Sequence, residues 1–510
     1  MTNLVGAFAA SVEQQPGKIA LFWGDREFSY TELWKQAVFV SEQLRQRFGL
    51  KSGARVGLWL KNCPEFIPSL FGILHAGAVV VPINNFLKPA EVRYILEDAG
   101  VDILITDEDL GAHSQELQAA RPRLQIFKAE AYASASVSLE DVRLTLAAAH
   151  ELEKGRESDF QEVPPGLAVI IYTSGTTGRP KGAMLSHANL LHNVESCRIV
   201  LQTVAADRFA VMLPMFHSYM LTVGLLLPLL VGGSIVLVKS LHPVRNALME
   251  IIERQASVLP AIPQFYRSLI NAPGHVTLPA RLCVSGAAPL PAQVLKEFEA
   301  RFHVPLIEGY GLSEASPVVT KNPLDGSRKA GSIGLPIANV EVSIQDEAGR
   351  ELAPDEIGEL CVRGGNVMMG YWKQPLETAK VMRNDWLLTG DIGYRDAEGY
   401  FYITDRKKDM LLVNGINVYP REIEEILYEF PGVKEAAVIG KPDPRKGEQP
   451  VAFVAANDGA SLEEKAIQEF VRQRLADYKV PRRVVVLPAL PRNATGKILK
   501  TTLRELPISK

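Results

Sequence analysis

An α/β fold of more than one domain is predicted by two observations: strand-like and helix-like runs alternate, and the 510-residue chain exceeds what one core usually holds. Ile19–Trp23, residues 55–60 and Val79–Pro82 are typical of buried strands, and residues 64–76 are typical of a helix. Strands that alternate with helices favour a parallel sheet with crossover connections.

The helix after the first strand has its own start signal. Ser29 precedes it and Glu32 stands three residues later, which is the spacing of a capping box. Further strands are predicted at Ile103–Thr106 and at residues 169–172 and 235–238, with glycine and proline at the turns. Together these elements predict one large N-terminal body with several layers of sheet and helix.

A domain boundary is predicted near residue 405. The hairpin-like run 399–404 is followed there by the polar cluster 405–409. The remaining elements are a helix at 420–430, a strand near 433–440, a strand after Pro450 and a helix at 462–477. We therefore expect an N-terminal domain of residues 1–405 and a small α+β domain of residues 406–510.

The composition excludes several classes of protein. With 47% hydrophobic residues, 22% charged residues and a net charge of -3, the chain is ordinary globular material with no electrostatic case for nucleic-acid binding. The N-terminus lacks a basic region and a long apolar run, so no secretion signal is expected. The cysteines are widely spaced and predict a reduced, cytoplasmic setting: Cys63, Cys197, Cys283 and Cys361.

Residues 219–238 are long and apolar enough to suggest a membrane helix. Pro228 and the pair Gly232 and Gly233 divide the segment, however, and a β-branched run follows them. A buried helix, a turn and a strand are therefore predicted, with no transmembrane segment. Peripheral contact with a membrane and the oligomeric state stay open.

The most informative stretch is YTSGTTGRPKG at residues 172–182, which follows an apolar run at 167–171. Glycine lets backbone N–H groups approach an anion, hydroxyls add donors, and Lys181 adds a positive charge. The stretch is not a mononucleotide P-loop, because Lys181 is followed by Gly182 rather than by a hydroxyl residue. A flexible surface linker is the alternative, but linkers rarely follow a buried strand directly. The predicted phosphate-binding residues are Thr173, Ser174, Gly175, Thr176, Thr177, Gly178 and Lys181.

A second polar stretch, EGYGLSE at residues 308–314, suits a nucleotide base and a metal ion. Tyr310 stands between two glycines and could stack on a base, and Ser313 and Glu314 follow it. Magnesium prefers one or two protein carboxylates together with phosphate oxygens, so Glu314 alone would suffice. The alternative for Glu314 is a solvated acid at the start of a helix.

Three further residues suit a nucleotide, although each has an ordinary alternative. Asp391 ends a strand-like run and could accept two ribose hydroxyls, or it could simply belong to a turn. Arg406 could bind ribose or phosphate with its forked guanidinium, or it could be part of a solvated basic turn. Lys497 follows a flexible Thr-Gly pair and could reach another domain, although such lysines usually lie on the surface.

His217 stands just before the apolar segment and could form a polar lid on a hydrophobic pocket or be a hydrogen-bonded core histidine. The sequence contains no His-Glu-x-x-His motif, no Cys/His zinc spacing and no Gly-x-Ser-x-Gly elbow. Zinc hydrolases and serine-triad hydrolases are therefore excluded.

Taken together and in order, five stretches resemble the adenylate-forming superfamily of acyl-CoA synthetases, adenylation domains and luciferases: YTSGTTGRPKG, EGYGLSE, TGD, DRKKD and PRNATGK. The resemblance covers essentially the whole chain and is closest to bacterial long-chain fatty-acid CoA ligases. It implies an N-terminal body of two sheet-based subdomains and a β-barrel-like one, with a mobile C-terminal lid.

The resemblance also implies a reaction in two halves. A carboxylate attacks the α-phosphate of MgATP, giving acyl-AMP and pyrophosphate, and the thiol of CoA then displaces AMP to give a thioester. The resemblance implies that the phosphate-binding residues, Thr173 and Lys181 among them, hold the phosphates and that Glu314 binds Mg²⁺. It implies that Lys497 bridges the substrate carboxylate and the α-phosphate. The nucleoside would be bound at adenine by Gly286, Ala287, Tyr310 and Gly311 and at ribose by Asp391 and Arg406.

Some residues have implied roles outside the nucleotide site. Lys408 matches the hinge about which the lid turns, and Gly415 would let the pantetheine arm of CoA pass. Ser313 stands where threonine is commoner in the family but keeps the hydroxyl. His217, counted with the catalytic residues, occupies the position at which relatives that activate amino acids carry an aspartate. An unpaired buried ammonium is costly, so amino acids are disfavoured as substrates.

The small-molecule acid predicted as substrate is a medium- to long-chain fatty acid, which places the enzyme in fatty-acid metabolism. The residues that would suit such a chain, or that could simply be core, are Met212, Met215, Phe216, Met220 and Leu221. An aryl-acid CoA ligase and a ligase that loads an acyl-carrier protein stay as alternatives. A non-catalytic acyl or nucleotide binder is disfavoured, because it would be expected to have lost at least one of Glu314, Asp391, Arg406 and Lys497.

Overall fold

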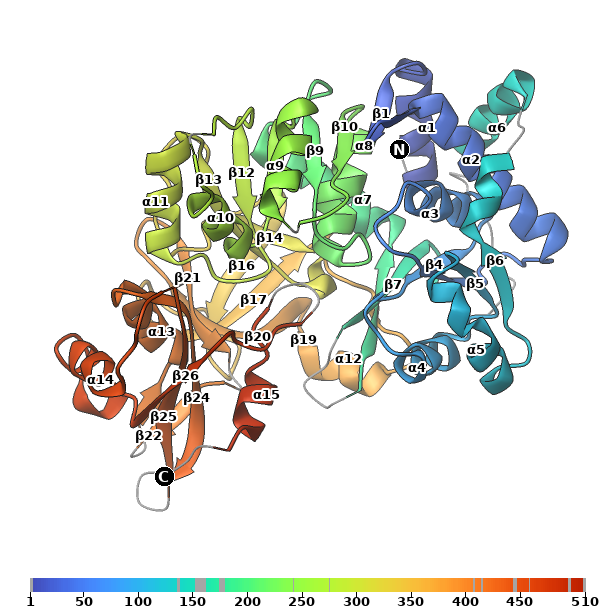
Figure 1. Ribbon diagram of the computed structural model, residues 1–510. Coiled ribbons are helices and arrows are strands. Elements are labelled where there is room, and N and C mark those ends of the chain that lie inside the picture. The colour runs from blue at the N-terminus through green and yellow to red at the C-terminus, as the bar shows by residue number, and fades with distance from the viewer. Residues whose placement is uncertain are drawn as a thin grey trace.

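The computed structural model describes residues 3–134, 138–151, 162–173, 179–241, 243–274, 276–406, 409–413, 416–443, 447–457, 459–493 and 497–507. Figure 1 shows a large body of sheets and helices with a smaller C-terminal domain, in orange and red, against one side of it. The predicted α/β class and the small second domain are confirmed. The boundary between residues 405 and 406 stays a prediction.

The first large sheet has seven strands in the order β18-β8-β7-β4-β3-β5-β6. Its central strands pair in parallel, as the alternation of strands and helices predicts, and β8 pairs antiparallel with both of its neighbours. The strands are β3 (Arg55–Trp59), β4 (Val79–Pro82), β5 (Ile103–Thr106), β6 (Gln125–Lys128), β7 (Leu167–Thr173), β8 (Lys181–Ser186) and β18 (Gly370–Tyr371).

The second large sheet has nine strands in the order β15-β14-β13-β12-β11-β9-β10-β1-β2, parallel from β13 to β1 and antiparallel at both edges. One hydrophobic core reaches both large sheets, since it includes Leu21 and Phe209 from this sheet and Val56 and Val169 from the other. The strands are β1 (Ile19–Trp23), β2 (Arg26–Ser29), β9 (Arg208–Val211), β10 (Ser234–Leu237), β11 (Val258–Ala261), β12 (Leu282–Ser285), β13 (Leu306–Gly311), β14 (Val318–Lys321) and β15 (Leu335–Pro336).

The subdomain expected to be barrel-like is an antiparallel sheet of five strands. A bridge between Gly334 and Phe401 joins it to the segment before β15 of the nine-stranded sheet. The strands are β16 (Val340–Gln345), β17 (Gly358–Gly364), β19 (Met382–Arg383), β20 (Trp386–Arg395) and β21 (Phe401–Arg406).

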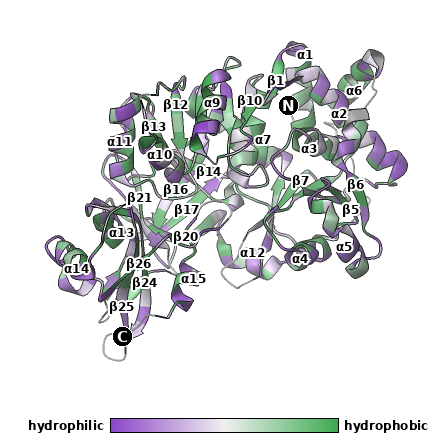
Figure 2. Cartoon of the chain, in the orientation of Figure 1, coloured by the Kyte–Doolittle hydropathy of each residue, from purple (hydrophilic) through white to green (hydrophobic). Residues whose placement is uncertain are grey.

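Helices cover the sheets of the body, and Figure 2 shows hydrophobic green in the strands and more purple on the outer helices. Ser29 caps the second helix, and Glu32 completes the predicted capping box. The helices are α1 (Leu4–Gln14), α2 (Tyr30–Glu42), α3 (Phe66–His75), α4 (Pro89–Ala99), α5 (Ser114–Ala120), α6 (Leu139–Glu151), α7 (His187–Leu201), α8 (Leu227–Leu230), α9 (Val244–Glu253), α10 (Pro263–Ile270), α11 (Ala292–Phe302) and α12 (Pro375–Val381).

The segment that resembles a membrane helix is a buried part of the body. It forms a π-helix at Met220–Leu226, the short helix α8 and the strand β10, so the predicted helix, turn and strand are confirmed. Within the described ranges, no helix has the length and apolar character that a membrane crossing requires.

The C-terminal domain is a five-stranded sheet with three helices. The strand expected after Pro450 begins earlier, at Gly447, because its long partner β24 continues the pairing past Pro450. The helix expected at 462–477 is shorter and is followed by a turn of 3₁₀-helix at Asp477–Lys479. The elements are β22 (Leu411–Val413), β23 (Ile416–Val418), α13 (Pro420–Glu429), β24 (Val433–Asp443), β25 (Gly447–Ala456), α14 (Glu464–Arg472), β26 (Arg483–Leu487) and α15 (Lys500–Glu505).

We predict that Gly393→Ala destabilises the protein. A Cβ atom at Gly393 would lie 2.0 Å from the carbonyl oxygen of Tyr402, so β20 and β21 would have to separate. Overpacking of this kind costs roughly 1–3 kcal/mol. Thermal unfolding at one scan rate should show a lower midpoint for Gly393→Ala, whereas Gly17→Ala should match the parent because no atom lies within 4 Å of its Cβ position. Equal midpoints for both variants would contradict the close approach.

Candidate active site

The predicted phosphate-binding stretch connects β7 to β8. Thr173 ends β7 and pairs directly with Lys181, the first residue of β8. The antiparallel pairing therefore holds Thr173 and Lys181 beside each other at the two ends of the connection. The other predicted members lie outside the described residues: Ser174, Gly175, Thr176, Thr177 and Gly178.

Lys181 is buried in a polar cluster. Its ammonium group forms an ion pair with Glu377 and lies 5.2 Å from the centre of the Tyr371 ring. Hydrogen bonding to Lys181, and next to Lys380, lowers the pKa of Glu377 to about 2. The Tyr371 hydroxyl in turn donates a hydrogen bond of 2.9 Å to Glu314. The two residues that the sequence predicts for phosphate and metal, Lys181 and Glu314, are thus linked through Tyr371.

Sequence reasoning missed both Tyr371 and Glu377. Tyr371 reaches the site because the two-residue strand β18 pairs with β8, with Tyr371 opposite Ala183. Glu377 lies in the first turn of α12, directly after that strand. Neither residue stands in a sequence pattern that indicates chemistry. They reach Lys181 only because β18 pairs with β8, which is far from it in the sequence.

Glu314 suits a magnesium ion that is completed by phosphate oxygens. It lies in a 3₁₀-helix at Ser313–Ala315 and is half-buried, with Tyr371 as a hydrogen-bond donor to one oxygen. In the described part of the chain, no group of three or more histidine, cysteine, aspartate or glutamate side chains could hold a metal by itself. One carboxylate beside a phosphate site is the arrangement that magnesium accepts.

Tyr310 and Asp391 are joined by a hydrogen bond of 2.5 Å, in which the Tyr310 hydroxyl donates. Asp391 is buried, and its backbone lies directly opposite Arg406 across β20 and β21. The side chain of Arg406 lies outside the described residues. The structure therefore brings together Tyr310, Asp391 and the backbone of Arg406, three of the residues predicted for the nucleoside.

The residues around Tyr310 are closely packed. A Cβ atom at Gly311 would lie 2.2 Å from the carbonyl oxygen of Pro317, so no other residue fits there without a shift of the backbone. The Ser313 hydroxyl lies 3.0 Å from the Ser218 hydroxyl, just after His217 in the chain. The Ser313 hydroxyl, retained where threonine is commoner, therefore has a definite contact.

Gly286 and Ala287 follow the end of β12, beside β13. The strands are parallel and in register, with Ser285 opposite Glu308, so Gly286 and Ala287 lie at the same sheet edge as Tyr310. Ala287 has a φ of +63°, which is uncommon for a residue with a Cβ. Ser285 is fully buried, and its hydroxyl has no hydrogen-bond partner among the described residues. That free donor is consistent with a ligand at this edge.

His217 is half-buried, and its ring is uncharged at neutral pH. Burial, and next the charge of Lys497, lower its pKa to about 4. Its Nδ1 atom accepts a hydrogen bond of 3.3 Å from the Tyr219 N–H. Because the charge of Lys497 acts on His217, the C-terminal domain brings Lys497 close to the body at this point. The Lys497 side chain is exposed, and its backbone forms two hydrogen bonds of 2.9 Å with Asn493.

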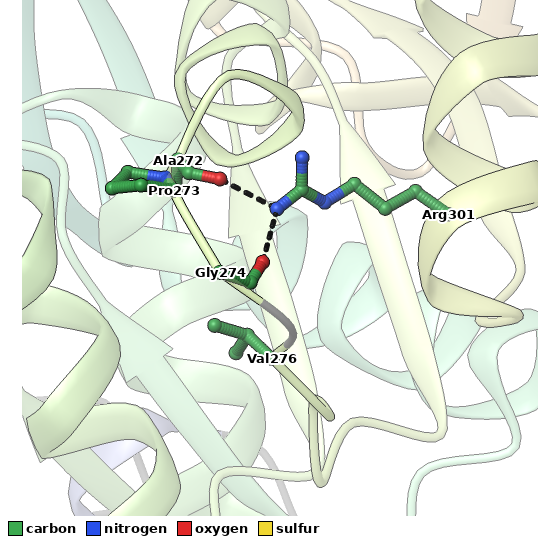
Figure 3. Close-up of a pocket in the computed structure, with 5 residues that line it drawn as sticks. All are labelled: Ala272, Pro273, Gly274, Val276 and Arg301. Carbon is green, nitrogen blue, oxygen red and sulfur yellow. Dashed lines mark hydrogen bonds between the residues drawn. The ribbon is translucent and has the colours of Figure 1, made fainter.

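The remaining predicted residues, Lys408 and Gly415, lie outside the described residues. A hollow of about 420 Å³ between α10 and α11 is lined by none of the predicted residues. Figure 3 shows Arg301 reaching across this hollow to the carbonyl oxygens of Ala272 and Gly274, at 2.5 and 2.8 Å. Arg301 thus ties down a surface loop, and the hollow is separate from the candidate site.

Residues 8–372 match the family described as AMP-binding enzyme, and residues 422–497 match the AMP-binding enzyme C-terminal domain. The chain belongs to the AMP-binding enzymes. This confirms the resemblance to the adenylate-forming superfamily. The long-chain-fatty-acid–CoA ligase of Bacillus subtilis (strain 168) is 36% identical, over 97% of this chain and 93% of that relative.

Two other relatives show the range of the group. Feruloyl-CoA synthase of an Amycolatopsis species is 34% identical over 96% of both chains. ATP-bound MatB from Rhodopseudomonas palustris, known from a crystal structure, is 32% identical with a TM-score of 0.86, and the match covers 99% of this chain and 98% of that one. This AMP-binding enzyme is therefore one of the adenylate-forming acid–CoA ligases, a group whose members use both alkyl and aryl acids.

We predict that the pKa of His217 reports the position of Lys497. In the parent protein the His217 ring should stay neutral from pH 8 to pH 5, because its pKa is about 4. Lys497→Ala should raise that pKa, since the Lys497 charge lowers it. Histidine ring signals followed by NMR, with His217→Gln for assignment, measure both values. Lys465→Ala, an exposed position in α14, is the control and should leave the pKa unchanged. A His217 pKa near 6.5 in the parent would contradict the lowered value that burial of the ring and the Lys497 charge imply.

Proposed function

We propose that the protein is an ATP-dependent acyl-CoA ligase for medium- to long-chain fatty acids. In the first half-reaction a carboxylate oxygen attacks the α-phosphorus of ATP, and the bond to the β-phosphate oxygen breaks to release pyrophosphate. In the second, the CoA sulfur attacks the acyl carbon, the bond to AMP breaks, and the thiol proton is lost. The observation that carries the proposal is the approach of Lys497 to the half-buried His217, at an edge where Lys181, Glu314 and Tyr310 also gather.

The departing pyrophosphate would be held at the connection between β7 and β8. Thr173 and Lys181 stand at its ends, and Ser174, Thr176 and Thr177 would add hydroxyl donors between them. Fixed donors aimed at developing negative charge lower the barrier because they need no rearrangement during the reaction. Glu314 would hold Mg²⁺, which neutralises charge on the phosphates when it is bound.

The nucleoside would lie along the edge formed by β12, β13 and β20. Gly286, Ala287 and Gly311 offer backbone beside adenine, and Tyr310 offers its ring. Asp391 would accept hydrogen bonds from the ribose hydroxyls, with Arg406 opposite it on β21. The hydrogen bond from Tyr310 to Asp391 supports this assignment, because it joins the base side and the ribose side of one site.

Lys497 would bring together two anions that otherwise repel each other, the substrate carboxylate and the α-phosphate. Its positive charge lies near an uncharged imidazole, so His217 does not compete for either anion as a second cation would. Holding the two reactants in contact makes the attack effectively unimolecular. His217 would contribute by shaping this part of the pocket and by excluding water from it.

The second half-reaction would need a different arrangement of the C-terminal domain, because Lys497 serves only the first. Lys408 would be the hinge, and the β22–β23 connection at Gly415 would face the pantetheine arm of CoA. Domain rotation between half-reactions is a known type of conformational step, in which a few residues at the end of an element absorb the change. The proposed setting is the cytoplasm.

The acyl group would lie against the apolar residues beside His217. Met212, Met215, Met220 and Leu221 are all buried and belong to the hydrophobic clusters of the body. Phe216 differs from them, because its ring lies edge-on to Phe86, at 6.5 Å between centres, and the Phe86 side chain is 63% exposed. Phe216 and Phe86 thus form an apolar pair next to His217, and Phe86 is open to solvent. This pair supports the proposal that the substrate carries an alkyl chain. The 34% identity to feruloyl-CoA synthase keeps an aryl acid as the second candidate.

The function is tested by pyrophosphate release over fatty, aryl and amino acids, with and without CoA. We expect release with fatty acids of medium to long chain, acyl-CoA formation when CoA is present, and no product with amino acids, because no buried carboxylate is predicted to pair their ammonium group. A higher kcat/KM for aryl acids would favour the second candidate. Product from amino acids, or no CoA thioester with any acid, would contradict the proposal.

Lys497→Ala should separate the two half-reactions. Loss of the bridging charge should lower acyl-AMP formation by roughly 100-fold or more, in line with the loss of one preorganised stabilising group. Thioester formation from supplied acyl-AMP and CoA should be unchanged. Pyrophosphate release measures the first half and acyl-CoA formation the second, with Lys465→Ala as the control. Equal loss in both halves would mean that the role given to Lys497 is wrong.

A further inference from the structure

The body and the C-terminal domain meet where α13 and the start of β24 lie beside α10, α11 and β13, as Figure 1 shows for α11 and α13. Two arginines connect the two parts, Arg421 from α13 and Arg267 from α10. Neither residue belongs to the nucleotide site proposed above. Both make contacts between the body and the C-terminal domain, which carries Lys497.

Arg421 faces a buried carboxylate of the body. Glu308 in β13 is 5% exposed, accepts a hydrogen bond of 3.0 Å from the Leu290 N–H, and lies 3.9 Å from the nearer Arg421 nitrogen. Burial raises the pKa of Glu308 to about 7, although the Arg421 charge opposes that rise. A buried carboxylate is costly without a cation nearby, so Glu308 favours the arrangement that brings Arg421 to it.

Arg421 is also tied to the end of the body sheet. Its backbone N–H donates a hydrogen bond of 3.1 Å to Asp405, next to Arg406 in β21. Its Nε atom lies 3.8 Å from Glu425, and a backbone hydrogen bond from Ala292 of α11 reaches Glu425. Among the described residues, the Nη2 atom of Arg421 has no hydrogen-bond partner, and it faces the Glu308 carboxylate as an ion pair at 3.9 Å.

Arg267 holds β24 from the other side. Its guanidinium donates to the carbonyl oxygen of Lys434 at 2.8 Å and lies 5.4 Å from the centre of the Tyr428 ring. The next residue, Glu435, accepts hydrogen bonds from the Leu490 N–H at 3.0 Å and from Arg492 at 2.9 Å. Arg492 begins the loop that carries Lys497, so Arg267 holds the strand to which that loop is attached.

We propose that Glu308, Arg421 and Arg267, here called the closure clasp, are positioning residues that hold the C-terminal domain where Lys497 reaches the reacting carboxylate. The inference rests on the proposed function. Rotation of the domain for the second half-reaction would remove Arg421 from Glu308 and Arg267 from β24. The closure clasp should therefore serve acyl-AMP formation and be dispensable for thioester formation.

Arg421→Gln tests the clasp. It leaves Glu308 buried without a cation, so acyl-AMP formation should fall about tenfold, while thioester formation from supplied acyl-AMP should stay the same or rise. Arg474→Gln is the matched control, because the Arg474 side chain contacts Phe470 and Glu429 of its own domain. Equal loss in both halves for Arg421→Gln, at an unchanged unfolding midpoint, would overturn the proposal.

The double variant Glu308→Gln/Arg421→Gln provides a sharper test. Glutamine at 308 can still accept from Leu290 but carries no buried charge, so the penalty left by Arg421→Gln is removed. Acyl-AMP formation should recover part of the lost rate relative to Arg421→Gln alone. If the rate of acyl-AMP formation falls in the double variant by the product of the falls in Glu308→Gln and Arg421→Gln, the two residues act independently. That result would overturn the closure clasp.

A structural readout separates this inference from the proposed function. If Arg421→Gln allows the C-terminal domain to move away from the body, the Lys497 charge moves away from His217. The pKa of His217 should then rise, which NMR can measure without any substrate. Arg267→Gln should have the same effect, and Arg474→Gln should not. If the parent protein has no ligase activity but the His217 pKa rises in Arg421→Gln, the proposed function is wrong and the closure clasp stands. If the parent is an active ligase but the His217 pKa does not rise in either variant, the closure clasp is wrong and the proposed function stands.

Discussion

The hydrogen bond from Tyr310 to Asp391 joins the two sheets between which the site is built. Tyr310 ends β13 of the nine-stranded sheet, and Asp391 lies in β20 of the antiparallel sheet. Asp391 is 2% exposed, and a buried polar side chain is costly unless it is hydrogen-bonded. Arg406 lies opposite Asp391 at the end of β21, the last strand before the C-terminal domain. The proposed nucleoside side of the site thus depends on this junction.

Strand β13 contacts both the C-terminal domain and the antiparallel sheet within a few residues. Glu308 faces Arg421 of the C-terminal domain, and Tyr310, two residues later, faces Asp391. Residues two apart in a strand point to the same side of the sheet, so the two contacts share one face. The proposed nucleotide site at Tyr310 and the contact with Arg421 thus lie on one face of the same strand.

The fold class, most strands and the capping box could be predicted from the sequence because they depend on local patterns. Ile103–Thr106 and Ile19–Trp23 have the predicted bounds, and Ser29 and Glu32 form the predicted capping box. The position of Tyr371 could not be predicted, since it depends on the pairing of a two-residue strand with β8. Glu308 could not be predicted either, because only the tertiary fold shows that its carboxylate is buried and faces Arg421.

The two lysines of the site are held in different ways, and the difference fits the two halves of the proposed reaction. Lys181 is buried within the body, with Glu377 and the Tyr371 ring around it. Lys497 is exposed in the C-terminal domain, and its charge acts on His217 of the body. A phosphate grip is needed as long as ATP or pyrophosphate is present, whereas a bridge between carboxylate and α-phosphate must leave before a thiol can take its place. A fixed lysine suits the first task, and a lysine on a separate domain suits the second.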